Sequence, residues 1–185
     1  MEDRRASRKP LRLRDYDYGR GGMYFVTICT KDKVCCLSRV EAPGSVGALH
    51  EAPAVTLTDL GQMVDKMILS LPNRYPGVQI EKYVVMPNHV HLLLYLPPPE
   101  TGAHRDAPLP TGKTGKGGTR TLLAQMVGYV KMNVSKEAHV KYPDLQLWQP
   151  RYHDHVVRGE ADYLRIWNYI DTNPAKWAKD KYYVP

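Results

Sequence analysis

The sequence predicts an α+β fold in which one antiparallel sheet packs against helices. Short runs rich in β-branched and aromatic residues alternate with segments of helical periodicity, and a further helical segment follows the last run. Hydrophobic residues make up 43% of the 185 positions, which is enough for a core. This length indicates a single domain, which we expect over residues 23–185 after a basic N-terminal arm of residues 1–22.

Each expected element follows from a local pattern. Strands are predicted where β-branched and aromatic residues gather between turn signals, at residues 23–30, 78–86, 89–96 and 147–158. Helices are predicted where apolar residues recur at spacings of three and four, at residues 60–71, 119–139 and 160–173. Thr58 is a candidate N-cap for the first helix, and Pro174 cannot continue the last one. Residues 41–56 and a flexible insert at about 97–118 are predicted loops.

The resulting order is βαββαβα. Its first six elements match the ferredoxin-like split βαβ pattern, and the seventh is an added C-terminal helix. This fold hosts many functions, so function has to be inferred from particular residues.

The formal net charge of +7 favours a polyanionic partner. Cationic side chains gain affinity for nucleic acid by releasing the counterions condensed on it. The alternative is a soluble protein that happens to be basic.

The three cysteines, Cys29, Cys35 and Cys36, form a poor disulfide framework because their number is odd and two are adjacent. No Cys-x-x-Cys pair is present, which argues against a cysteine zinc site. The N-terminus lacks the apolar core of a signal peptide, and no apolar run is long enough to span a bilayer. We therefore expect a cytoplasmic protein without membrane contact.

The segment His89-Val90-His91 is the sharpest chemical feature of the sequence. Residues two apart in a strand point to the same face at a separation of about 7 Å, so two imidazoles there could hold one divalent metal. Val90 would face the opposite side and pack on the helices. The leucines that follow indicate a central strand, where an imidazole without partners is unfavourable. The alternative is a pair of hydrogen-bonded histidines on a sheet face.

A polar stripe marks the last predicted helix. Asp162, Arg165, Tyr169 and Asn173 are spaced by three, four and four residues. Tyr169 and Asn173 would therefore lie one turn apart, as a nucleophile and a metal ligand could. The stripe also places Arg165 near Tyr169, where a cation could favour the phenolate. The alternative is a solvated polar face that happens to include a tyrosine.

Four blocks of the sequence together resemble the REP-associated tyrosine transposases, a branch of the HUH transposases that act on single-stranded DNA. The blocks occur in the family's order at residues 24–27, 86–91, 148–158 and 168–174. The second block, MPNHVH, resembles the HUH motif. The last block, NYIDTNP, resembles the Tyr-x-x-x-Asn-Pro block of the REP-associated branch.

This resemblance implies a metal-dependent nuclease and strand transferase with the last helix as its catalytic helix. His89 and His91 would bind Mg²⁺ or Mn²⁺, with Asn173 as a third ligand. Tyr169 would attack the scissile phosphate and form a covalent 5′-phosphotyrosine, which a second strand could resolve. The implied substrate is single-stranded DNA with REP-type hairpins. The implied protein is a nucleoid-associated monomer rather than a homodimer.

Other interpretations stay open at this point. The chain could be a hairpin-binding module that has lost catalysis, or a replication-initiating nickase of the same HUH class. Tyr129 is a second candidate nucleophile. His153, Asp154 and His155 could bind metal, although hydrogen bonds or DNA contacts are the favoured explanation. The candidate DNA contacts are Arg12, Arg14, Arg20, Arg151, Arg158 and Arg165.

Deleting residues 1–15 is expected to weaken DNA binding, because the deletion removes basic side chains that would contact phosphates. Each lost phosphate contact should lower the slope of log affinity against log salt by about 0.7 for single strands. Anisotropy titrations at several salt concentrations measure that slope. An unchanged slope would identify the arm as a passive tail.

Overall fold

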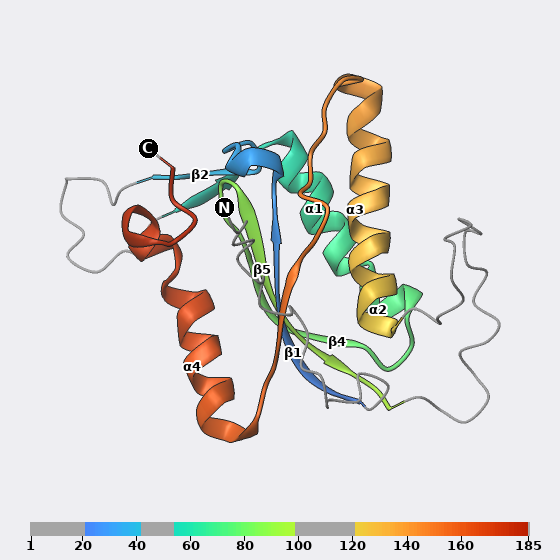
Figure 1. The fold of residues 1–185 in the computed structure, drawn as a ribbon, viewed down its shortest axis with the longest axis vertical. Helices are drawn as coiled ribbons and strands as arrows, with labels where there is room; N and C mark the ends of the chain where they lie inside the picture. Colours follow the sequence, from blue (N-terminus) through green and yellow to red (C-terminus); the bar gives the residue numbers. More distant parts are fainter. Residues whose placement is uncertain (1–20, 42–53, 99–120, 185) are drawn as a thin grey trace, which may run out of the picture.

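The computed structural model describes residues 21–41, 54–98 and 121–184. Within them, four strands form one antiparallel sheet in the order β4-β5-β1-β6 (Figure 1). These strands are β1 (Gly22–Cys29), β4 (Gln79–Val85), β5 (His89–Leu96) and β6 (His153–Val156). The first strand lies between the third and fourth of this sheet, as in the split βαβ pattern. The predicted α+β class is therefore confirmed.

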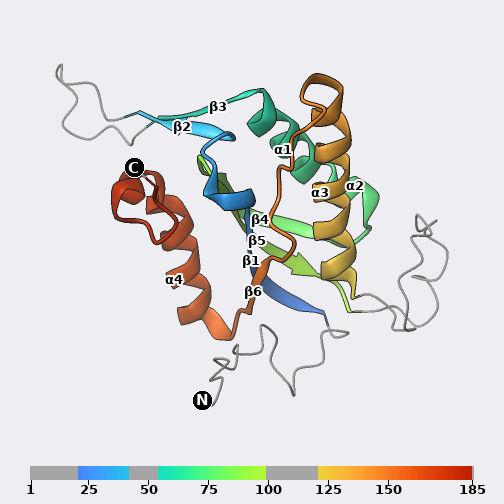
Figure 2. The same ribbon diagram turned by 45° about the horizontal axis from the view of Figure 1, so that its top comes forward.

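Helices cover both faces of this sheet (Figures 1 and 2). Helices α1 (Asp59–Leu69) and α3 (Leu122–Lys141) lie on one face, and α4 (Gly159–Thr172) lies on the other. Among the described residues, no helix has the length and apolar character needed to cross a membrane.

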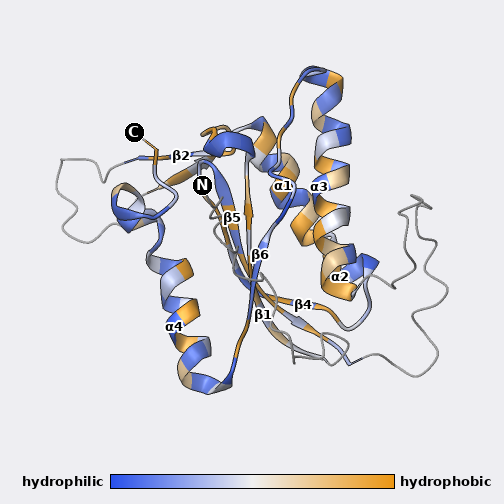
Figure 3. Ribbon diagram, viewed as in Figure 1, coloured by the Kyte–Doolittle hydropathy of each residue, from blue (hydrophilic) through white to orange (hydrophobic). Residues whose placement is uncertain are grey.

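The side chains of β5 alternate between two cores. Val90, Leu92 and Leu94 belong to the main core with α1 and α3. Leu93 points the other way and packs against Ile166 and Ile170 of α4. All three helices are amphipathic, with hydrophilic and hydrophobic residues interleaved along each (Figure 3). The face with α4 is the one that carries the odd-numbered residues of β5, including both histidines.

Thr58 caps α1 as predicted, since its side chain accepts a hydrogen bond from the backbone N–H of Gly61. The helix is shorter than expected, however, and ends at Leu69. A separate short helix, α2 (Leu71–Arg74), follows it. Pro72, which lacks a backbone N–H, explains why one continuous helix does not form.

The predicted strand at 147–158 is also too long, because β6 covers only four residues. Trp148 makes an isolated bridge to Thr30, and Pro150 separates that bridge from β6. The chain also does not leave helical geometry at Pro174, since a 3₁₀ helix, Pro174–Lys179, continues from α4. Proline is tolerated there because the first residues of a helix need no N–H partner.

Part of the loop predicted at 41–56 is a strand. A second sheet consists of β2 (Ser38–Val40) and β3 (Val55–Leu57), visible beside α1 in Figure 2. Strands of three residues are too short to show periodicity. The rest of this loop, most of the insert at 97–118 and most of the basic arm lie outside the described residues.

Gly61 is packed where no side chain fits. A Cβ atom at this position would lie 2.0 Å from the carbonyl oxygen of Leu37, which is backbone and cannot move aside cheaply. Gly61→Ala is therefore expected to lower the free energy of unfolding by about 1–3 kcal/mol, although alanine is the better helix former.

Gly128→Ala in α3 is the matched control, because nothing lies within 4 Å of a Cβ atom there. This substitution should raise the free energy of unfolding by up to about 1 kcal/mol. Urea denaturation measures both values, and equal effects at the two positions would contradict the packing argument.

Candidate active site

The two histidines of β5 are fully buried on the face that α4 covers. Their Nε2 atoms lie 3.0 Å apart, and their ring centroids lie 4.4 Å apart. Two imidazole lone pairs at this separation repel each other unless a proton or a cation lies between them. The expected juxtaposition of His89 and His91 is therefore present.

Hydrogen bonds at the Nδ1 atoms orient both imidazole rings. The Nδ1 atom of His89 lies 2.9 Å from the side-chain oxygen of Asn88, whose amide nitrogen donates to the backbone oxygens of Lys33 and Tyr182. Because that side-chain oxygen only accepts, the proton of His89 lies on Nδ1 and the lone pair lies on Nε2. The Nδ1 atom of His91 pairs with the hydroxyl of Thr27 at 2.9 Å. Such outer partners are typical of metal-binding histidines.

Burial also keeps both imidazoles neutral. Desolvation lowers the pKa of His89 to about 4, and the negative charge of Asp180 offsets this effect only in part. Desolvation and the neighbouring His89 lower the pKa of His91 well below its usual value. Neutral imidazole is the form that binds metal.

Helix α4 brings Tyr169 to the histidine pair. The phenol oxygen lies 3.2 Å from Nε2 of His91 and 3.2 Å from a carboxylate oxygen of Asp180. The ring of Phe25 packs edge-on against Tyr169, with centroids 6.0 Å apart. Burial raises the pKa of Tyr169, and the Asp180 carboxylate raises it further, so the resting phenol is protonated.

Asn173 lies one turn further along, as the spacing predicted, and only 2% of it is exposed. Its amide nitrogen donates to Oδ2 of Asp180 at 2.6 Å. Its amide oxygen is buried and has no hydrogen-bond partner. A buried acceptor without a partner, on the residue that pairs with Asp180, is suited to be a ligand if the histidines hold a metal.

Asp180 is the member of the site that sequence reasoning missed. Ligand atoms of His89, His91 and Asp180 all lie within 4.8 Å of one another. The carboxylate follows the 3₁₀ helix, so its position depends on the path of the chain after Pro174. No periodic pattern links it to the other residues, and an aspartate between two lysines gives no signal of its own.

The second candidate nucleophile lies elsewhere. Tyr129 is on α3, across the sheet from the histidines, and its ring packs edge-on against Tyr75. The side chain of Asn133 donates to the backbone oxygen of Tyr129 rather than reaching a metal.

The histidines of β6 are on the same sheet face as His91 but are exposed. Nε2 of His155 bonds to Asp162 at 2.7 Å, which matches the hydrogen-bonding explanation favoured for this segment. Arg165 also pairs with Asp162, at 2.5 Å. A carboxylate three residues earlier therefore holds the guanidinium of Arg165, for which the sequence suggested a place near Tyr169.

Basic side chains flank the site. Lys33 and Lys181 lie over the ring of Tyr182, at 5.8 and 4.7 Å from its centroid, and this ring stacks on His89 at 4.6 Å. No motif or periodic pattern in the sequence singles out these two lysines. Arg151 and Arg158 are exposed, while the other predicted contacts, Arg12, Arg14 and Arg20, lie outside the described residues.

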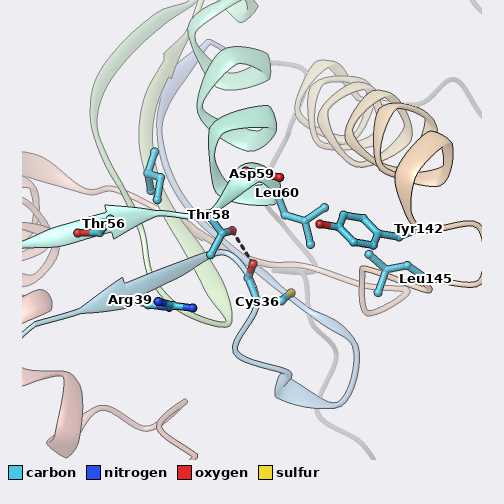
Figure 4. A pocket seen from close by; sticks show the side chains of 9 residues that line it. Cys36, Arg39, Thr56, Thr58, Asp59, Leu60, Tyr142 and Leu145 are labelled. Carbon is cyan, nitrogen blue, oxygen red and sulfur yellow. Dashed lines mark hydrogen bonds between the residues drawn. The ribbon is translucent and has the colours of Figure 1, made fainter.

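A separate cavity of about 600 Å³ lies between the β2–β3 hairpin and the segment after α3 (Figure 4). Thr58, Leu60 and Tyr142 line it, and the Thr58 hydroxyl donates to the backbone oxygen of Cys36 at 2.7 Å. None of the predicted site residues lines this cavity.

Comparisons relate this chain to proteins of one kind. An uncharacterised protein of Haemophilus influenzae is 30% identical over 178 residues, which cover 96% of this chain and 93% of that protein. A second Haemophilus influenzae protein, named as a candidate REP-associated tyrosine transposase, is 26% identical over 161 residues, or 86% of this chain and 74% of that protein. Over most of its length, the chain is therefore similar to a candidate REP-associated tyrosine transposase.

A solved structure of a REP-associated tyrosine transposase bound to a REP hairpin has the same fold. Its TM-score with this chain is 0.57 at 22% identity, and the match covers 92% of this chain and 76% of that chain. No protein-family model matches the sequence.

The lowered pKa values of the histidine pair should make the stability of this protein depend on pH. In metal-free protein, an unfolded imidazole takes up a proton near pH 6.5, whereas folded His89 does so only near pH 4. Lowering the pH through this window should therefore reduce the free energy of unfolding by up to about 1.4 kcal/mol per pH unit for each such imidazole. Urea denaturation in EDTA measures this slope.

His89→Gln should flatten the slope, and His139→Gln, at an exposed position of α3, should leave it unchanged. If His89→Gln keeps the wild-type slope, the histidine pair is not the source of the pH dependence.

Proposed function

We propose that this protein cuts and rejoins single-stranded REP-type hairpin DNA through a covalent 5′-phosphotyrosine on Tyr169. The observation that carries the proposal is the phenol oxygen 3.2 Å from Nε2 of His91, within a buried histidine pair. Similarity to a candidate REP-associated tyrosine transposase supports the reaction class. The solved relative bound to a REP hairpin supports the substrate.

We further propose that His89, His91 and Asn173 hold the divalent ion, Mg²⁺ or Mn²⁺. The residues fit such an ion because two neutral imidazoles face each other and a buried amide oxygen lacks a partner. The nearby carboxylate of Asp180 adds negative charge. When bound, the ion would offset the charge of the phosphate oxygens and favour the phenolate.

The proposed reaction has a cleavage step and a rejoining step, and both use the phenol oxygen of Tyr169. Tyr169 attacks the phosphorus, the phosphate becomes bonded to the phenol oxygen, and the leaving 3′ oxygen takes a proton to become a free hydroxyl. The phosphotyrosine ester conserves the bond energy, so attack by another 3′-hydroxyl rejoins strands without ATP. Phe25 packs against the nucleophile and helps to fix its direction.

DNA binding is supported by charge and position. Lys33 and Lys181 beside the histidines are suited to backbone phosphates, which flank any scissile bond. Tyr169 and both histidines come from one chain and already meet, which supports a monomer. The proposed DNA substrate implies a nucleoid-associated, cytoplasmic protein.

Tyr169→Phe is the central test, since it removes one oxygen and little else. Hairpin affinity and folding should survive, whereas cleavage of a labelled hairpin with Mn²⁺ should be lost by at least 1000-fold (roughly 4 kcal/mol of barrier). Tyr129→Phe on α3 is the matched control and should cleave at the wild-type rate. A denaturing gel and mass spectrometry of the adduct provide the readouts.

The outcomes separate the rival functions. An adduct on another tyrosine would refute the site while keeping the reaction class, and nicking without any adduct would refute the transferase. Binding without cleavage would favour the inactive hairpin-binding module, whereas cleavage without joining of a second strand would favour a replication-type nickase.

His91→Ala should abolish cleavage but keep hairpin binding, and undiminished cleavage would exclude the metal role.

A further inference from the structure

The side-chain amide of Asn173 has one possible orientation. Its nitrogen lies 2.6 Å from Oδ2 of Asp180, and an ionised carboxylate can only accept hydrogen bonds. The NH₂ group must therefore face Asp180, and the amide oxygen must face away. An amide turned the other way would direct its NH₂ group, which cannot bind a metal, toward the histidines.

The carboxylate of Asp180 is itself held firmly. Its Oδ1 atom accepts from the backbone N–H of Tyr182 at 2.7 Å. Its Oδ2 atom accepts from both Asn173 and the Tyr169 hydroxyl. The backbone N–H of Asp180 donates to the carbonyl oxygen of Trp177 at 3.0 Å, which ties the residue to the 3₁₀ helix. Both oxygens are therefore engaged before any ion binds.

We propose that Asp180 is a positioning residue that acts through Asn173. It fixes the amide so that the oxygen faces the histidine pair, and it directs the Tyr169 hydroxyl to the same place. The inference rests on the proposed metal site. Asp180 could instead bind the ion directly, since it lies within reach of both histidines. Direct binding through Oδ2 would have to displace hydrogen bonds from Tyr169 and Asn173, and Oδ1 already accepts from the backbone of Tyr182, which favours the indirect role.

A double-mutant cycle on the full-length protein separates the two roles. Metal affinity is measured by calorimetry without DNA in wild type, Asp180→Asn, Asn173→Ala and the double variant. Mn²⁺ serves as one probe, and Ni²⁺ as the other, because its higher affinity for imidazole keeps weak variants measurable. This readout does not depend on cleavage.

Asp180→Asn should weaken metal binding about 10–100-fold in the wild-type background, as the loss of an outer partner does. The same substitution should weaken metal binding by less than about threefold when Asn173 is already alanine, because no amide is then left to orient. The charge of a carboxylate would contribute equally in both backgrounds. Equal losses in the two backgrounds would overturn the inference and identify Asp180 as a ligand.

The exchanged variant N173D/D180N guards against a folding defect. It keeps the net charge and restores the hydrogen bond with donor and acceptor reversed, while a carboxylate oxygen now faces the histidines. It should bind metal at least as tightly as wild type. Binding no better than in D180N alone would contradict the proposal.

A further variant, His91→Ala, distinguishes failure of the proposed metal site from failure of the proposed role of Asp180. His91→Ala should reduce affinity for both metals more than any Asp180 variant does. If His91→Ala binds metal like wild type, the proposed metal site itself fails. If His91→Ala loses binding while Asp180→Asn does not, only the role of Asp180 fails.

Discussion

Strand β5 has partners on both edges and packing on both faces, and this double burial constrains every side chain that it carries. The even-numbered residues of β5 complete the main core with α1 and α3. The odd-numbered residues face α4, and two of them are histidines that are fully buried from solvent. A buried imidazole is tolerated only with partners on both ring nitrogens. Hydrogen bonds with Asn88 and Thr27 give each ring one partner, at Nδ1, and leave the two Nε2 atoms facing each other.

The position of Tyr169, the proposed nucleophile, depends first on apolar contacts between α4 and the sheet. Ile166 and Ile170 of α4 pack on Leu93, and Tyr169 lies beside them on the helix. Lys82 of β4 adds a second attachment, since its ammonium lies 4.4 Å from the Trp167 ring centroid and pairs with Asp171 at 2.5 Å. These contacts hold the helix against the sheet, with the Tyr169 hydroxyl 3.2 Å from His91 of β5.

Local periodicity predicted what depends on local geometry. The two-residue repeat of a strand placed both histidines on one face, and the helical repeat placed Asn173 one turn from Tyr169. Periodicity carries no information on the 3₁₀ segment, so Asp180 was not predictable although it touches both of those residues. The partner of Arg165 was missed for a related reason. The spacing of Arg165 would allow contact with either Tyr169 or Asp162, and its positive charge favours the carboxylate of Asp162.

The small size of the core beneath α4 has a consequence for cooperativity. Among the described residues, the buried apolar cluster beneath α4 consists of Leu93, Ile166 and Ile170, whereas the opposite face holds most of the apolar core. Elements with few buried contacts open at a lower free energy than the global transition. Amide hydrogens of α4 therefore exchange with solvent sooner than those of β5. Such a sub-global opening would separate Tyr169 from the histidines while the sheet stays folded, so the proposed cleavage should be lost at denaturant concentrations below the global unfolding transition.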